Sequence, residues 1–214
     1  MANADPHADA PLLHIGPKLE EAAGVIVMMH GRGASAESIL SLYPELGLEN
    51  LAALAPQAAG YSWYPQSFLA PLEMNQPYLD SALTKVETVV GDMLSRGIAS
   101  SKIALLGFSQ GACLTTEFVA RHPRRYGAVM ALTGGLIGPA GTPRDYVGAL
   151  DQTPVFLGSS DPDPHVPFAR VKETHQVLTQ MGAKVDMRRY PGMPHSINEE
   201  EIEVCRQMLR DMLT

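Results

Sequence analysis

The feature that most constrains the fold is a five-residue turn, Gly107-Phe108-Ser109-Gln110-Gly111, between two patterned segments. The apolar run before it, 101–106, predicts a buried strand, and residues 110–122 after it have the pattern of a helix. Glycines on either side of a sharp bend let the chain pass without a Cβ clash. A serine at the apex of such a strand–turn–helix unit is raised above the sheet edge, so Ser109 is the candidate nucleophile.

The rest of the chain alternates strand-like apolar runs with helical patterns. Strands are predicted at 11–15, 24–30, 51–55, 101–106, 127–133, 153–158 and 184–189, and helices at 35–43, 75–96, 110–122, 166–181 and 198–213. This alternation predicts an α/β fold with a mostly parallel central sheet and helices on both faces. Right-handed crossovers then place four loops along one sheet edge, namely 30–33, 107–111, 158–167 and 190–196.

A serine nucleophile needs a general base, and four histidines follow Ser109 in the chain. His122 is too close along the predicted helix to fold back over its own N-terminus, and His175 falls on a helical face. His165 sits between two prolines. His195 lies in the loop after the last predicted strand, where a parallel sheet presents its chemistry, and it is therefore the candidate base.

The base needs an orienting acid, which is expected in the loop after the strand 153–158. That loop carries Asp161 and Asp163, two residues apart and each followed by proline. Asp151 lies at the wrong end of the same strand. Because an Asp before Pro also favours a turn, spacing alone does not choose between Asp161 and Asp163.

The chain resembles the bacterial phospholipase/carboxylesterase family, the α/β-hydrolase branch that also contains acyl-protein thioesterases. The resemblance runs from about Val25 to Leu213, and its segments are His30-Gly31-Arg32-Gly33, Ala55-Pro56-Gln57, Gly107-Phe108-Ser109-Gln110-Gly111, Asp163-Pro164-His165-Val166-Pro167 and Gly192-Met193-Pro194-His195. It implies an α/β-hydrolase fold without a large lid domain. The family's acid is the Asp of the Asp-Pro-x-Val-Pro segment, which implies Asp163, and its base falls on His195.

Acyl transfer also needs hydrogen-bond donors aimed at the oxyanion. One is expected at the backbone N–H of Gln110, the residue after the nucleophile. The resemblance places the second at the backbone N–H of Arg32. His30 is expected to be a structural histidine beneath this loop. Arg32 departs from the acyl-protein thioesterases, which usually carry an apolar residue here. Two interpretations remain open: its charge disfavours long apolar acyl chains, or its side chain is solvated and only its backbone matters.

Residues 57–72 hold the only Trp and several other aromatic side chains, so they are expected to form a pocket wall. The substrate-pocket candidates are Trp63, Tyr64 and Phe68. The glycine-containing segment 133–138 is a candidate for a second rim, as either a tight or a mobile loop.

Bulk properties exclude several function classes. The formal charge of −7 disfavours nucleic acid and stable membrane association. Two cysteines form no disulfide framework, and the seven histidines have no metal-ligand spacing, so neither a metal nor a cofactor is expected. The length of 214 residues predicts one domain, 1–214, with a flexible, polar segment 1–11. No secretory signal is recognised, and the expectation is a cytoplasmic monomer or homodimer.

These observations lead to one hypothesis and its rivals. The chain is expected to be a serine carboxylesterase that hydrolyses small, short-acyl esters through Ser109, His195 and Asp163. Lysophospholipase or acyl-protein thioesterase activity uses the same machinery and is the alternative. A non-catalytic ligand-binding protein on the same fold is the remote alternative, because fold alone does not determine function.

Overall fold

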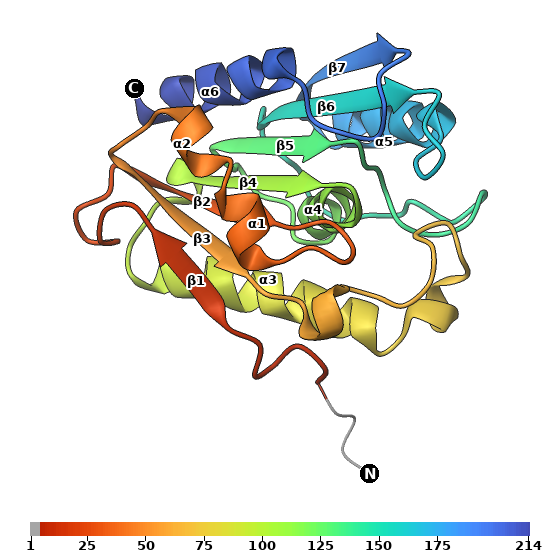
Figure 1. The fold of residues 1–214 in the computed structure, drawn as a ribbon, viewed down its shortest axis with the longest axis horizontal. Coiled ribbons are helices and arrows are strands. Elements are labelled where there is room, and N and C mark those ends of the chain that lie inside the picture. The colour runs from red at the N-terminus through yellow and green to blue at the C-terminus, as the bar shows by residue number, and fades with distance from the viewer. Residues whose placement is uncertain (1–4) are drawn as a thin grey trace.

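The computed structural model describes residues 5–214 and is built on one seven-stranded sheet (Figure 1). Its strands are β1 (Leu12–Ile15), β2 (Gly24–Met29), β3 (Leu51–Pro56), β4 (Ile103–Phe108), β5 (Ala128–Leu132), β6 (Pro154–Asp161) and β7 (Lys184–Pro191). Their spatial order is β1-β3-β2-β4-β5-β6-β7. Only β1 pairs in the antiparallel sense, with β3, and the other neighbours are parallel. This confirms the predicted α/β-hydrolase class of fold.

Helices cover both faces of the sheet, and each face has its own apolar core (Figure 1). The α-helices are α1 (Ala36–Leu40), α2 (Tyr43–Leu46), α3 (Tyr78–Ser95), α4 (Gln110–Arg121), α5 (Phe168–Gln180) and α6 (Glu199–Leu213), with short 3₁₀ turns at Ala59–Tyr61, Leu72–Asn75 and Ser100–Lys102. Helices α3, α4 and α5 pack on one face, and α1, α2 and α6 pack on the other.

The central strands show why their sequences read as unbroken apolar runs. Every residue of β2 is buried, with Val25 and Val27 facing one core and Ile26 and Met28 facing the other. Strands that are covered by helices on both faces expose no side that would favour polar residues. The same geometry brings the carboxyl ends of the parallel strands to one sheet edge, where the predicted site loops lie.

Differences between predicted and observed elements occur mainly where proline interrupts a pattern. The predicted helix 35–43 ends at Leu40, and a separate helix with Pro44 in its first turn follows. Helices α3 and α5 begin one residue after Pro77 and Pro167. Proline lacks a backbone N–H and suits helix starts, so these positions begin helices rather than continue them.

The N-terminal segment 1–11 was expected to be flexible, and of it residues 1–4 lie outside the described part of the chain. The remainder is anchored by His7, which is fully buried. Its backbone N–H donates to Ser81 Oγ at 2.8 Å, and its ring bonds the Trp63 carbonyl and the Ala59 N–H at 3.0 and 2.9 Å. An imidazole with both nitrogens satisfied is stable when buried, so His7 ties this segment to the body of the protein.

Within residues 5–214, no helix is both long enough and apolar enough to cross a bilayer.

Candidate active site

Ser109 occupies a strained turn between β4 and α4. Its φ of 55° lies in the left-handed region that residues other than glycine rarely adopt. The neighbouring glycines allow this bend through close backbone contacts: a Cβ at Gly107 would lie 2.3 Å from the Gly111 oxygen, and one at Gly111 would lie 2.1 Å from the Met29 oxygen. Helix α4 therefore docks directly on the end of β2, and the turn holds Ser109 at the start of the helix.

The three residues predicted from sequence as nucleophile, base and acid lie in one hydrogen-bonded chain. His195 Nε2 is 2.8 Å from Ser109 Oγ, and His195 Nδ1 is 2.7 Å from Asp163 Oδ2. Asp163 Oδ1 accepts from the backbone N–H groups of His165 and Val166 at 2.7 and 2.8 Å. In this arrangement Nδ1 donates to the carboxylate, which leaves Nε2 free to accept the Ser109 proton.

The electrostatics of Asp163 suit an ionised carboxylate. Burial alone raises the pKa of this carboxyl, but the hydrogen bonds from His195 and from the two backbone N–H groups outweigh it, so the net pKa is lowered. Asp161, the alternative acid, instead forms an ion pair with Arg189, whereas the bond to the His195 ring comes from Asp163. The geometry therefore distinguishes two carboxylates that spacing left equivalent.

One neighbour of the site was not anticipated. The ring of His165 packs edge-on against His195, with 4.9 Å between the ring centroids, and it lines the cavity over Ser109. The ring of Phe108 also packs against His195, with 5.2 Å between the ring centroids. The sequence places His165 two residues after the candidate acid, but it does not indicate that the His165 side chain points toward His195.

The loop 30–33 lies over the start of α4, with His30 beneath it. His30 is fully buried, its Nδ1 donates to the Gly31 carbonyl at 2.8 Å, and its Nε2 accepts from the Ala58 N–H at 3.1 Å. Burial lowers the pKa of this imidazole, which keeps it neutral. His30 therefore has the structural role expected from the sequence.

Residues 61–66, which we call the brace, connect this loop to α4. The Gln110 side chain accepts from the Trp63 N–H at 2.9 Å and donates to the Tyr64 carbonyl at 2.8 Å. The Arg32 guanidinium donates to carbonyls of the same segment, and the Gly33 N–H donates to its first residue, Tyr61, at 2.7 Å. The two residues whose backbone N–H groups are oxyanion-hole candidates are thus tied by their side chains to one short segment.

A cavity of about 510 Å³ opens over Ser109, between the brace and the loop 164–166. Two of the three pocket candidates, Tyr64 and Phe68, line it. Trp63 does not: it is fully buried behind the wall, and its indole N–H donates to the His30 carbonyl at 2.9 Å. The expectation for Trp63 was wrong, because its N–H finds its partner on the inner side of the loop. Cys113, one turn beyond Ser109, also lines the cavity.

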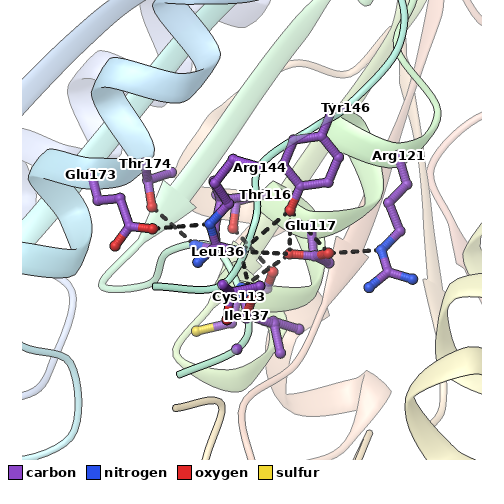
Figure 2. Close-up of polar contacts among 12 residues, drawn as sticks. Cys113, Thr116, Glu117, Arg121, Leu136, Ile137, Arg144, Tyr146, Glu173 and Thr174 are labelled. Carbon is purple, nitrogen blue, oxygen red and sulfur yellow. Dashed lines mark hydrogen bonds and ion pairs between the residues drawn. The ribbon is translucent and has the colours of Figure 1, made fainter. Parts of the chain in front are cut away.

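A buried charge network holds the segment 133–146 behind this cavity (Figure 2). Glu117 of α4 is its centre: it pairs with Arg121 at 2.7 Å, and it accepts from the Ile137 N–H at 3.0 Å and the Tyr146 hydroxyl at 3.1 Å. Arg170 of α5 donates to two carbonyls of the same segment at 2.6 Å. The segment is therefore a tight loop, the first of the two alternatives considered from its glycines.

The same network reaches the pocket wall at Phe68. The Gly138 N–H donates to the Phe68 carbonyl at 2.7 Å, and the Arg170 guanidinium carbon lies 5.9 Å from the Phe68 ring centroid.

Among residues 5–214 there is no cluster of three or more His, Cys, Asp or Glu side chains suited to hold a metal ion.

Comparisons with known proteins show the family and the fold of the chain. The family model described as Phospholipase/Carboxylesterase matches residues 11–213. A crystal structure of a phospholipase/carboxylesterase from Dyadobacter fermentans is 44% identical, covers 94% of this chain and 97% of its own, and superposes with a TM-score of 0.91. Acyl-protein thioesterase 1 of Debaryomyces hansenii is 26% identical over 95% of this chain and 97% of its own. The structure of Arabidopsis thaliana SOBER1, 20% identical over 89% of this chain and 99% of its own, shares the fold with a TM-score of 0.75.

Proposed function

The chain belongs to the phospholipase/carboxylesterase family of hydrolases, and we propose that it is a serine carboxylesterase acting on small, short-acyl esters. The observation that carries this proposal is the hydrogen-bonded chain from Ser109 through His195 to Asp163 at the floor of a cavity. A serine, a histidine with a free Nε2 and a buried carboxylate are the parts that covalent acyl transfer requires.

The proposed cycle uses these side chains and water. His195 accepts the Ser109 proton as Oγ attacks the ester carbonyl, while Asp163 holds the imidazole tautomer and stabilises the imidazolium. The backbone N–H groups of Gln110 and Arg32 donate to the oxyanion. His195 then protonates the leaving alcohol, an acyl-enzyme remains on Ser109, and water repeats the sequence to release the acid.

Two features favour short acyl groups. Tyr64 and Phe68 form part of the cavity wall, and the Phe68 carbonyl is held by the N–H of Gly138. Arg32 lines the same cavity and its guanidinium lies beside the Tyr64 ring. Packing a long alkyl chain against this charge would remove water from it without replacing that interaction.

The test is hydrolysis of para-nitrophenyl esters of graded acyl length, with wild type and Ser109→Ala compared side by side. We expect wild-type activity to be highest with short acyl groups and to disappear in the variant. Activity that survives Ser109→Ala would refute the assigned nucleophile, and a preference for long acyl chains would refute the short-acyl assignment.

Thioester hydrolysis is the second candidate, because an acyl-protein thioesterase matches nearly the whole chain. The same serine machinery cleaves both bonds, so the two activities are separated by substrate and not by mechanism. Comparing kcat/KM for an oxygen ester and a thioester with the same acyl group decides between them.

A further inference from the structure

The Arg32 side chain is held in a fixed position with part of its hydrogen-bonding capacity unused. Its Nη1 donates to Ser62 Oγ at 3.2 Å and to the Pro65 carbonyl at 2.8 Å, and its Nη2 donates to the Gln66 carbonyl at 2.5 Å. A guanidinium has five N–H donors. Within the described residues Nε makes no hydrogen bond and Nη2 uses one of its two, so one edge of the group is free.

The charge of Arg32 is also unpaired. All three acceptors are neutral oxygens, and within residues 5–214 Arg32 forms no ion pair. By contrast, Arg144 and Arg170 both pair with Glu173 at 2.9 Å. Among the described residues that line the cavity, Arg32 is the only Lys or Arg and there is no Asp or Glu. In a chain with a formal charge of −7, this cavity carries a fixed positive charge.

The wall beside Arg32 is otherwise neutral. The Tyr64 hydroxyl is fully buried beside the Cys113 side chain, and burial raises the pKa of this phenol well above its ordinary value. The Arg32 guanidinium carbon lies 5.9 Å from the centroid of the Tyr64 ring. The charge of Arg32 is therefore not offset within this part of the wall.

We propose that the cavity selects esters that carry a carboxylate on their acyl or their alcohol part, and that Arg32 binds this carboxylate. The proposal rests on the esterase function above and names its substrate class. A carboxylate matches two parallel N–H donors of a guanidinium, and a group already fixed by three acceptors loses little further freedom on binding. The brace thereby does two things: it positions the loop and it presents a cation to the substrate.

The test uses pairs of esters that differ only in charge. One pair is the mono-para-nitrophenyl ester of adipic acid and its methylated twin, which place the charge on the acyl side. The other is 4-carboxyphenyl butyrate and its methyl ester, which place it on the alcohol side. For each pair the quantity measured is the ratio of kcat/KM for the anionic ester to that for the neutral ester.

For at least one pair, we expect the ratio in Arg32→Met to be about tenfold lower than in wild type. Tenfold is the change in kcat/KM expected from the loss of one charge-assisted hydrogen bond. Arg32→Lys should retain part of the ratio, because the charge remains and the planar fork is lost. The control is Arg210→Met, which removes the same charge from the exposed side of α6 and should leave the ratio unchanged. Using a ratio cancels any common loss that follows from disturbing the brace.

If Arg32→Met lowers both esters of each pair equally, Arg32 only braces the loop and the proposal is overturned. Binding provides a readout that does not depend on turnover: calorimetry of the same pairs with Ser109→Ala, with and without Arg32→Met. We expect tighter binding of the anionic twin only when Arg32 is present, and its absence would also overturn the proposal. If the wild type hydrolyses none of these esters but calorimetry still shows tighter binding of the anionic twin when Arg32 is present, only the esterase function is rejected.

Discussion

The Gln110 side chain provides the most direct test of how the site is held together. It bonds two main-chain groups of the brace, the Trp63 N–H and the Tyr64 carbonyl, and it also donates to Ser62 Oγ. Gln110→Ala removes these bonds and leaves the backbone N–H of residue 110, the candidate oxyanion donor, in the chain. The substitution therefore separates the support of this donor from the donor itself.

The magnitude follows from the Trp63 N–H, which loses its acceptor, whereas the Tyr64 carbonyl still accepts from Ser62 Oγ at 2.9 Å. Leaving one buried donor unsatisfied costs about 1–3 kcal/mol, which is the expected loss in the free energy of unfolding. If the donor moves with its released support, kcat should also fall. Removing one oxyanion donor costs about 10²–10³ in kcat, which sets the upper limit for a displaced one.

The assay is urea unfolding followed by the fluorescence of Trp63, the only tryptophan, together with kcat on a short-acyl ester. Gln180→Ala is the matched control, because Gln180 lies exposed at the end of α5. We expect that control to change neither quantity. A Gln110→Ala protein with wild-type stability and wild-type kcat would refute the argument that the brace supports the donor.

Three further predictions concern carboxyl groups. Asp163→Asn should lower kcat by roughly 10⁴ and Asp161→Asn by far less, as measured on one ester, and the reverse order would reassign the acid. Glu117→Gln should lower the free energy of unfolding by about 1.5–3 kcal/mol in urea titration, because the buried acceptor of Arg121, Tyr146 and the Ile137 N–H loses its charge, and an unchanged midpoint would contradict this. Burial raises the pKa of Glu201 to about 7 from 4.5, so the folded state holds a proton that the unfolded chain releases. Stability should therefore decline by about 3 kcal/mol as pH rises from 4.5 to 7, and Glu201→Gln should abolish that decline in pH-dependent unfolding.

The fold was largely predictable because its signals are local. Apolar runs such as residues 24–29 identify strands buried on both faces, and the glycines around Ser109 mark a turn that no larger residue can make. The crossover rule then groups the site loops at one edge without knowledge of any contact. The positions of Ser109 and His195 follow from this topology alone.

The remaining features depend on side-chain direction, which spacing does not contain. Asp161 and Asp163 differ only in where their oxygens point, and the resemblance rather than the pattern distinguished them. Trp63 was assigned to the pocket by its type, but its N–H turns inward to His30. The packing of His7 required a partner in a distant helix, at Ser81. Long-range hydrogen bonds of this kind leave no periodic trace in a sequence.

The thiol of Cys113 shares the cavity with Ser109, and this has a practical consequence for covalent labelling. Burial raises the pKa of this thiol to about 12, so at pH 7 only about one molecule in 10⁵ carries a thiolate there. The second cysteine, Cys205, is also buried, and its pKa is raised as well. An electrophilic phosphonate that enters the cavity is therefore expected to react with Ser109 Oγ and not with the protonated thiol of Cys113. The number of labels per chain then counts competent molecules in a preparation, without any need to block the cysteines first.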